Sequence, residues 1–319
     1  MLAIVHPAPD VMELAIRPDP VPGTGQILVS VRAAGLNRAD LHQRAGRYPA
    51  PPGWPADIPG LEYAGEVAAI GAGVKRWQVG ERVMGLVGGG AHAEFVVVSE
   101  REAIAIPEGL SYTDAAAIPE AFLTAWDALV FRGRAVDGDR VLVHAIGSGV
   151  GTAAAQLGRE LDLAIIGTSR SASKLERCRA LGMVHGVLTD DDQWPGRVGD
   201  PVQVIIDTLG ATAFEQNLGL LSPKGHLVVL GTMTGGKAPG LDLSLVLRKR
   251  LTIVGTAMRV RSLEERVSLV ERFSQQILPM FADGRLKPIV DRVVAMRQIE
   301  TAHEAMLANE TFGKVVLNW

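Results

Sequence analysis

The chain has only one cysteine, Cys178, among 319 residues. A single cysteine excludes an intrachain disulfide framework and any four-cysteine structural zinc site. The N-terminal segment Met1–Asp10 lacks a basic region ahead of a long apolar core, and no apolar run approaches the ~18 residues that a membrane-spanning helix needs. We therefore expect a cytoplasmic protein that is neither exported nor membrane-spanning.

Neither sign of charge dominates the chain. The formal net charge is −3 and the basic residues are scattered, so the sequence has no footprint of nucleic-acid binding and no basic run that attracts a membrane surface. Hydrophobic residues make up 47% of the chain, which at this length is enough apolar material for two domains with separate cores. We expect a two-domain globular protein without a polyanionic partner.

The N-terminal part, from Ile27 to about Val98, has an all-β composition. Short β-favouring runs alternate there with glycine-containing turns such as Gly71-Ala72-Gly73. The predicted strands are Ile27–Ala33, Glu66–Ile70, Arg82–Val87 and Ala93–Val98. The proline-rich segment Tyr48–Pro59 indicates an ordered loop rather than a linker.

From about Ser111 helices and strands alternate, which implies a parallel sheet with helices on its faces. The predicted helices are Tyr112–Arg132, Gly151–Leu161 and Ala172–Leu181. The predicted strands are Arg140–His144, Ala164–Thr168, Val202–Asp207, His226–Leu230 and Leu251–Thr256. The C-terminal part then has a helix and two strand-like runs that can return to the first domain, Leu263–Phe281, Val290–Ala295 and Lys314–Leu317.

One turn in the second part indicates a dinucleotide site. The apolar run from Val141 breaks into small residues up to Gly151, and a strand that enters a helix through such a turn can hold a pyrophosphate on backbone N–H groups. The match to G-x-G-x-x-G is partial, because Ile146 and Ser148 occupy the first two glycine positions. An ordinary strand-to-helix turn is the alternative, but the Ser148 hydroxyl can also donate to a phosphate.

The end of the next strand indicates which dinucleotide binds. An NAD site usually places an acidic residue there for the ribose 2′-OH, whereas a 2′-phosphate needs donors and positive charge. Ser169 stands at the acidic position, followed by Arg170, Ser171 and Lys174, and the nearest carboxylate, Glu176, lies on the following helix. This pattern favours NADPH; its alternative is a solvated basic helix start.

Further short motifs follow one another over nearly the whole chain: Ala34-Gly35-Leu36-Asn37-Arg38-Ala39-Asp40-Leu41, Pro59-Gly60-Leu61-Glu62, Gly80-Glu81-Arg82-Val83, Ala116-Ala117-Ile118-Pro119-Glu120, Leu123-Thr124-Ala125, His144 to Gly151, and Gly313-Lys314. In these motifs the chain resembles the zinc-free medium-chain dehydrogenases/reductases of the NADPH:quinone oxidoreductase family. It is especially similar to the tumour-suppressor-inducible quinone oxidoreductase group.

The resemblance implies an α/β protein with a GroES-like, mostly-β catalytic domain, residues 1–120 and 261–319. That domain would clasp a Rossmann domain with a doubly wound parallel sheet, residues 121–260, with the active site in the cleft between them. The resemblance also assigns cofactor contacts: Thr124 near the nicotinamide, Ser148, Gly149 and Val150 on the pyrophosphate, Ser169, Arg170 and Lys174 at the 2′-phosphate, and Gly231, Thr232, Met233, Gly313 and Lys314 at the nicotinamide ribose.

Two side chains are implied to face the substrate, Asn37 and Tyr48. A protonated Tyr48 can donate to a quinone or enone oxygen, and two such donors aimed at that oxygen lower the barrier by several kcal/mol, on the scale of oxyanion holes. Tyr48 as a space-filling loop aromatic, and Asn37 as a cap for Arg38–Leu41, are the alternatives. Thr189 stands where close relatives have a tyrosine that packs near the adenosine phosphate.

We expect no catalytic metal. In zinc dehydrogenases of this superfamily a cysteine and a histidine ligand stand at the positions of Asn37 and Leu61, and zinc needs about three N, S or O ligands to leave an open catalytic position. Glu62 is then an isolated carboxylate, expected to accept hydrogen bonds in a turn. His42 and His92 lie in the same half of the chain but lack matching partners.

Three functions remain open. The first is zinc-independent hydride transfer from NADPH to a quinone. The second is reduction of the C=C bond of an enone or enal, which presents the same electrophilic pattern, and the third is a low-turnover NADPH-binding redox sensor. The apolar run Leu251–Gly255 predicts a sheet-edge strand that a second copy could cover, so we expect a homodimer.

Overall fold

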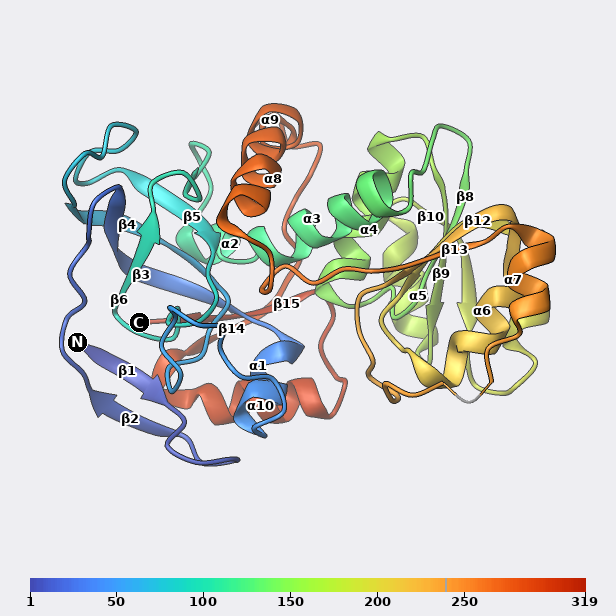
Figure 1. The fold of residues 1–319 in the computed structure, drawn as a ribbon, viewed down its shortest axis with the longest axis horizontal. Coiled ribbons are helices and arrows are strands. Elements are labelled where there is room, and N and C mark those ends of the chain that lie inside the picture. The colour runs from blue at the N-terminus through green and yellow to red at the C-terminus, as the bar shows by residue number, and fades with distance from the viewer. Residues whose placement is uncertain (239) are drawn as a thin grey trace. The chain divides into compact units, whose positions relative to one another are not determined.

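The computed structural model describes residues 1–238 and 240–319, which divide into two compact units (Figure 1). The first unit comprises Met1–Leu123 and Met258–Trp319, and the second comprises Thr124–Ala257. The sequence places the corresponding boundaries after residue 120 and before residue 261. Each unit has its own sheet.

The first unit is mostly β. A two-stranded hairpin is followed by a sheet in the order β14-β15-β3-β4-β5-β7, with β6 paired to β3. The pattern of β3 explains its central place, because Ile27, Val29 and Val31 point into the core while Ser30 and Arg32 alternate with them. The strands are β1 (Leu2–Val5), β2 (Glu13–Ile16), β3 (Gln26–Leu36), β4 (Glu62–Ile70), β5 (Arg82–Leu86), β6 (Phe95–Ser99), β7 (Ile104–Ala105), β14 (Val290–Ala295) and β15 (Lys314–Asn318).

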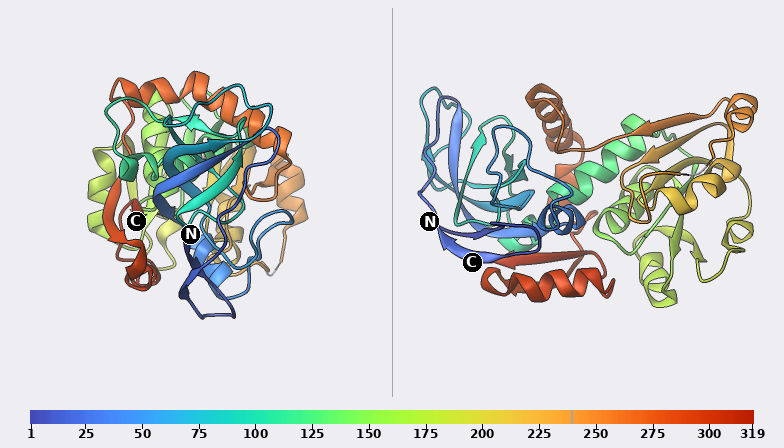
Figure 2. Two further views of the ribbon diagram at one scale, coloured as in Figure 1. Left: turned by 90° about the vertical axis from the view of Figure 1, so that its left-hand side faces the viewer. Right: turned by 60° about the horizontal axis from the view of Figure 1, so that its bottom comes forward.

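The C-terminal strand β15 belongs to the same sheet as the N-terminal strands β3 to β7. Strand β15 pairs antiparallel with β3 and parallel with β14, and α10 (Ile299–Leu307) connects these two strands (Figure 2). The first unit also contains the short helix α1 (Arg38–Arg44), which directly follows β3. Side chains on β3, β4, α1 and β15 are thereby brought into one unit although they are far apart in sequence.

Two predicted helices are interrupted at prolines. Residues 112–132 form α2 (Tyr112–Ala115), α3 (Pro119–Trp126) and a π-helical segment, Asp127–Arg132, rather than one helix. Residues 263–281 likewise divide into α8 (Leu263–Gln276) and α9 (Leu278–Ala282), with Pro279 in the first turn of α9. Proline lacks an N–H and restricts the residue before it, so it starts a helix readily and cannot continue one.

The second unit is a doubly wound parallel sheet, as the sequence predicts. Its strands are β8 (Arg140–Val143), β9 (Ala164–Ser169), β10 (Met183–Leu188), β11 (Val202–Asp207), β12 (Leu221–Val229) and β13 (Thr252–Gly255). They lie in the order β10-β9-β8-β11-β12-β13, so the direction of winding reverses between β8 and β11. Ligands of such sheets bind outside the carboxyl ends of the strands at this switch point.

The two directions of winding place helices on opposite faces of this sheet. The crossovers β8-α4-β9 and β9-α5-β10 run one way, with α4 at Gly149–Glu160 and α5 at Ala172–Arg179. The crossovers through α6 (Phe214–Leu220) and α7 (Leu243–Lys249) run the other way. Strand β13 lies at the edge, which confirms that prediction, and no helix in the described parts of the chain is long and apolar enough to cross a membrane.

Candidate active site

The turn between β8 and α4 is built to present backbone amides. Ala145 has φ +50°, a left-handed conformation that costs a non-glycine residue about 1–2 kcal/mol. Ser148 caps α4, with its Oγ accepting from the Gly151 N–H at 3.1 Å. A Cβ on Gly151 would lie 2.4 Å from the Ile146 carbonyl oxygen, so only glycine lets the helix approach the strand this closely.

The predicted pyrophosphate contacts lie at the start of this helix. Gly149 and Val150 supply the first two N–H groups of α4, which have no acceptor within a helix. The positive end of the helix dipole is at the same place and favours an anion. The Ser148 hydroxyl accepts from Gly151, so its own hydrogen is available to donate.

The residues predicted for the 2′-phosphate lie around the end of β9. Lys174 extends across the β8–α4 turn, because a Cβ on Gly147 would lie 3.0 Å from the Lys174 Cδ. The Ser169 hydroxyl accepts from the Ser171 N–H at 3.0 Å, and the Ser171 hydroxyl caps α5. Arg170 is exposed. The structure therefore brings Lys174 to the β8–α4 turn, where the pyrophosphate contacts are predicted, and leaves the Arg170 guanidinium accessible.

The predicted ribose contacts Gly231, Thr232 and Met233 follow β12 at the same edge of the sheet. The main chain of this segment is tied to the loop after β11, since the Gly231 and Met233 N–H groups donate to the carbonyls of Asp207 (3.3 Å) and Thr208 (3.2 Å). The turns after β8, β9, β11 and β12 thus gather at the carboxyl edge of one parallel sheet. This arrangement is the one that dinucleotide-binding sheets use.

A buried histidine lies under this edge. His144 contacts Thr168 Oγ1 through Nδ1 (2.9 Å) and Asn217 Oδ1 through Nε2 (2.8 Å). Burial lowers its pKa, so the ring is neutral at physiological pH. The His144 Nε2–H donates to the Asn217 oxygen, and His144 therefore ties the end of β8 to β9 and α6.

In the first unit, Asn37 and Lys314 are in direct contact. Lys314 Nζ donates to Asn37 Oδ1 (2.7 Å), Glu62 Oε1 (2.5 Å) and the Leu36 carbonyl (2.9 Å), which uses all three ammonium hydrogens. Asn37 Nδ2 donates to Glu62 Oε1 at 2.9 Å and to the Gly35 carbonyl at 3.3 Å. The nicotinamide-ribose role of Lys314 and the substrate role of Asn37 stay predictions.

Glu62 is the centre of this cluster. It lies in β4 rather than in a turn, is fully buried, and its Oε2 accepts from the Glu120 N–H at 2.8 Å. A Cβ at position 35 would lie 2.2 Å from Glu62 Oε1, so glycine is required there to admit the carboxylate. The predicted isolated carboxylate is thus the partner of a buried cation.

Asp40 lies beside Asn37 on α1 and is fully buried. Its Oδ2 accepts from the Asn37 N–H at 2.8 Å, while Oδ1 has no hydrogen-bond partner among the residues that the structure describes. Burial raises the pKa of this carboxyl to about 7, although the Asn37 hydrogen bond and the Lys314 charge oppose the rise. The chain therefore contains a carboxyl group with a pKa near neutral pH that is hydrogen-bonded to Asn37, one of the two predicted substrate residues.

Tyr48 follows α1 and is held by Arg259, not by Asn37. The Arg259 guanidinium lies 4.8 Å from the centre of the Tyr48 ring, and Nη1 donates to the Tyr48 carbonyl at 3.0 Å. Burial and the charge of Glu120 raise the pKa of Tyr48, so the phenol is protonated and able to donate. A neutral phenol is what the predicted role requires.

Thr124 and Gly313 are the two remaining residues predicted to lie near the nicotinamide. Thr124 is buried on α3. Gly313 has φ +86°, and a Cβ there would lie 2.2 Å from the Ile289 carbonyl oxygen, so no other residue fits this turn before β15. Their roles at the nicotinamide stay predictions.

No group of three or more His, Cys, Asp or Glu residues that could hold a metal occurs in the described ranges, 1–238 and 240–319. Leu61 is buried and Asn37 bonds to Lys314 and Glu62.

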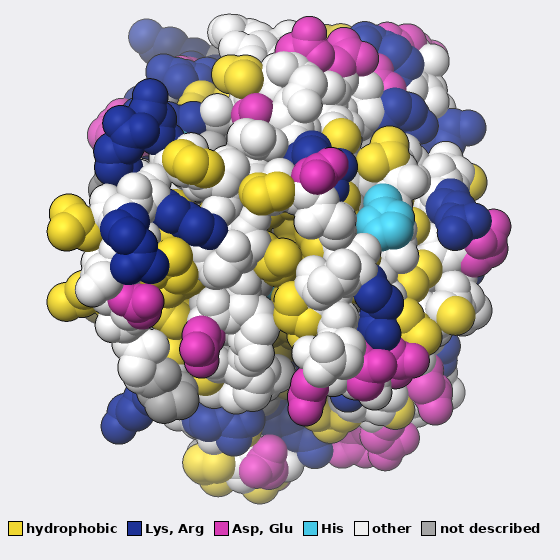
Figure 3. Space-filling model, turned by 90° about the vertical axis from the view of Figure 1, so that its right-hand side faces the viewer, with side chains coloured by type: hydrophobic (Ala, Val, Ile, Leu, Met, Phe, Trp, Pro, Cys, Tyr) yellow, Lys and Arg dark blue, Asp and Glu magenta, His cyan; other side chains and the backbone are white. Residues whose placement is uncertain are grey.

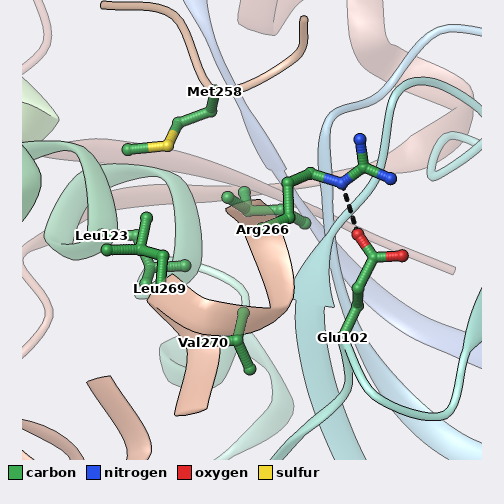
Figure 4. Close-up of a pocket in the computed structure, with 7 residues that line it drawn as sticks. Glu102, Leu123, Met258, Arg266, Leu269 and Val270 are labelled. Atoms are coloured by element: carbon green, nitrogen blue, oxygen red, sulfur yellow. Dashed lines mark hydrogen bonds and ion pairs between the residues drawn. The ribbon is translucent and has the colours of Figure 1, made fainter. Parts of the chain in front are cut away.

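The first unit also contains a cavity of about 10 Å³ beside the Arg266–Glu102 ion pair (Figure 4). This space is near the lower limit for one water molecule and too small for a substrate.

Sequence reasoning missed Arg259 and Asp40. Arg259 lies 216 residues from Gln43 and 171 from Gly88, two of its partners, so no local pattern could find it. Asp40 stands within a motif already singled out by its sequence, but its burial depends on the packing of α1. The burial and the contacts that single out these two residues become visible only in the folded structure.

Known protein families match segments in both units of the chain. The family described as Alcohol dehydrogenase GroES-like domain matches residues 23–108, and that described as Zinc-binding dehydrogenase matches residues 149–274. A rat synaptic vesicle membrane protein VAT-1 homolog is 32% identical over 97% of this chain and 81% of its own length. A quinone oxidoreductase of Pseudomonas aeruginosa is 30% identical over 97% of this chain and 96% of its own length.

Solved structures are similar over both units. An Escherichia coli quinone oxidoreductase complexed with NADPH gives a TM-score of 0.89 at 25% identity and covers 100% of both chains. The CurK enoyl reductase gives a TM-score of 0.86 at 25% identity, over 99% of this chain and 98% of its own.

Proposed function

The chain belongs to the medium-chain dehydrogenase/reductase family and is an NADPH-dependent oxidoreductase, and we propose that its hydride acceptor is a quinone. The second unit would hold NADPH and the first would supply the groups that receive the acceptor. The observation that carries the proposal is the protonated, partly buried Tyr48 phenol fixed by Arg259.

The cofactor side rests on the carboxyl edge of the parallel sheet. Gly149 and Val150 would bind the pyrophosphate through their amides, with the Ser148 hydroxyl as a further donor. Lys174 and Arg170 would bind the 2′-phosphate with charge-assisted hydrogen bonds, and Ser169 leaves no carboxylate at that strand end to repel it. When bound, NADPH supplies the hydride.

The acceptor side needs donors rather than a strong acid. Hydride addition to a quinone leaves a stabilised hydroquinone anion, so a neutral phenol that donates to the developing oxyanion is sufficient, and water can supply the proton. Tyr48 is the proposed donor, worth several kcal/mol on the scale of oxyanion holes. Asn37 is the proposed second donor, for which a substrate oxygen would replace the longer, 3.3 Å bond to the Gly35 carbonyl.

Reduction of an enone or enal is the second candidate. An α,β-unsaturated carbonyl also places negative charge on oxygen as hydride arrives, so the same donors would serve. The likeness to the CurK enoyl reductase favours this candidate. Only measured turnover separates it from quinone reduction.

Steady-state NADPH oxidation with 1,2-quinones, 1,4-quinones and 2-alkenals tests the proposal, with Y48F as the matched variant. We expect turnover with quinones and a kcat in Y48F lower by about 10²-fold. Turnover with 2-alkenals alone would replace the first candidate by the second. NADPH binding at micromolar affinity with no turnover on any acceptor would leave a cofactor-binding redox sensor instead.

We also propose that the chain forms a homodimer through the edge of the second unit's sheet. Within the described parts of the chain β13 pairs only with β12, so one side of this strand is open, and Leu243, Leu247 and Ile253 on α7 and β13 are exposed. Figure 3 shows the side of the second unit on which α7 lies, with hydrophobic side chains between charged ones. A second copy paired along β13 would satisfy its backbone and cover these leucines.

A further inference from the structure

Arg259 is a buried cation whose hydrogen bonds all go to neutral oxygens. Its side chain is 6% exposed. Nε donates to the Gly88 carbonyl (2.7 Å), Nη1 to the Tyr48 carbonyl (3.0 Å) and Nη2 to Gln43 Oε1 (2.8 Å). Burying a charge without a carboxylate at hydrogen-bond distance is costly, and an apolar side chain would fill the space without that cost. Stability alone therefore does not account for an arginine here.

The three acceptors belong to three separate segments of the first unit. Gln43 is on α1, Tyr48 is in the loop that follows it, and Gly88 follows β5. The last segment is itself tightly packed, since a Cβ on Gly88 would lie 2.4 Å from the Trp54 ring. The planar guanidinium fork fixes the Tyr48 loop against two rigid neighbours, which a single ammonium cannot do.

Arg259 also lies over the Tyr48 ring. The guanidinium carbon is 4.8 Å from the ring centre, within the range of a cation–π contact. The Arg259 charge lowers the pKa of Tyr48, against the rise caused by burial, Glu120 and Asp40. A cation at this place makes the phenol hydrogen more positive and the phenol a stronger hydrogen-bond donor.

We infer that Arg259 is a positioning residue that fixes the Tyr48 loop and strengthens the Tyr48 hydroxyl as a hydrogen-bond donor to an acceptor oxygen that becomes negative. The inference rests on the proposed function, in which Tyr48 is that donor. Arg259 itself forms no bond to the substrate. The Arg259 guanidinium is hydrogen-bonded to three protein oxygens, and Arg259 acts on the reaction through Tyr48.

A tyrosine titration tests the inference without turnover. The chain has only three tyrosines. Tyr63 is fully buried and burial raises its pKa far above the usual range, and Tyr112 donates to Glu66 at 2.6 Å. Subtracting the Y48F absorbance after stopped-flow jumps to about pH 9–12 isolates the Tyr48 phenolate. Wild type, R259K and R259Q are compared, with exposed Arg297 replaced in R297Q as the matched control.

We expect Tyr48 to ionise at a higher pH in R259Q than in wild type, and at nearly the wild-type pH in R259K and R297Q. R259K keeps the charge but loses the fork, so its kcat should fall about tenfold with the NADPH KM unchanged. R259Q should lose both contributions and have the lower kcat. If R259Q cannot be purified in folded form, the kcat and KM of R259K still test whether the guanidinium hydrogen bonds position Tyr48.

Two results overturn the inference. One is an unchanged Tyr48 ionisation in R259Q, and the other is a wild-type kcat in R259K. Failure of the proposed function looks different. If R259Q shifts the Tyr48 ionisation while Y48F turns over like wild type, Arg259 still controls the phenol but Tyr48 is not the donor in the reaction.

Discussion

Lys314 Nζ lies 2.5 Å from Glu62 Oε1, and both side chains are buried. The chain separates the two residues by 252 positions, and the pair joins the start of β15 to the start of β4. Asn37 bonds to both members. Asn37 is therefore held both by this ion pair and by its place as the N-cap residue of α1, where its N–H donates to Asp40 Oδ2.

The variant E62Q should destabilise the protein by about 3–5 kcal/mol, because it leaves the Lys314 ammonium buried without its counter-charge. Urea unfolding measures the change. The control is E264Q at the exposed Arg101–Glu264 pair, where solvent screens the charges and the effect should be far smaller. Equal losses in the two variants would contradict the buried-pair interpretation.

Asp40 should make stability depend on pH near neutrality. Its folded-state pKa is about 7 against the usual 3.8, so from about pH 4 to about pH 7 the folded state keeps a proton that the unfolded state has lost. The contribution of Asp40 to stability is therefore lost as pH rises through about 7. D40N removes this titration and keeps an acceptor for the Asn37 N–H.

Urea unfolding of wild type and D40N at about pH 5 and about pH 8 checks this sign. The stability of wild type relative to D40N should be lower at pH 8 by about 2–3 kcal/mol. The same difference at both pH values would show that Asp40 is ionised in the folded protein.

Three histidines of the first unit should make it sensitive to acid: His92 and His303 are buried, and His6 is partly buried. Burial lowers the pKa of His6 to about 4 and of His303 to about 3, and lowers that of His92 well below the usual value, with Arg44 opposing protonation of His6 and His303. The unfolded imidazoles protonate near pH 6.5, so the stability that these histidines contribute falls as pH decreases from about 6.5 to about 4 for His6 and to about 3 for His303. H303Q should move the midpoint of acid unfolding, followed by circular dichroism, to lower pH. An unmoved midpoint would exclude His303 as a cause.

How far the sequence predicts the structure depends on how local each signal is. Signals that depend on adjacent residues predict the structure well. The strand from Arg140, the small-residue turn after it and the strand that ends at Ser169 all lie where the sequence pattern predicts them. Strand β10 was missed because Gly186 and the exposed His185 weaken its pattern. The sequence does not predict the hairpin of β1 and β2, because β2 has no buried residue and so lacks the alternation of apolar and polar positions that marks a strand.

The first unit's site was harder to predict because its contacts are long-range. Tyr48 and Asn37 are singled out by motifs, but the partners that hold them, Arg259 and Lys314, come from the returning C-terminal part. Lys314 was assigned from its motif to the nicotinamide ribose, and only the fold shows that its ammonium is bonded to Glu62. Burial and pairing over 200 or more residues leave no periodic pattern in a sequence.

The proposed dimer makes a prediction about α7. Leu247 is 78% exposed, so L247D should leave the fold of the chain intact, while an unpaired charge in a covered interface should shift the protein toward monomer. Sedimentation velocity over a range of concentrations measures this. The exposed Val136, replaced in V136D, is the control for adding a charge elsewhere on the second unit. A wild-type mass of one chain at every concentration would contradict the dimer.

Cofactor choice should depend on Arg170 and Lys174. Lys174 lies across Gly147 in the turn between β8 and α4, and Arg170 is exposed at the end of β9. The double variant R170A/K174A should weaken NADPH binding by about 2–4 kcal/mol, because two charge-assisted hydrogen bonds to the 2′-phosphate are lost. NADH has no 2′-phosphate, so its affinity should be nearly unchanged. Fluorescence titration with both cofactors checks the difference, and equal losses would place the two side chains at the pyrophosphate instead of the 2′-phosphate.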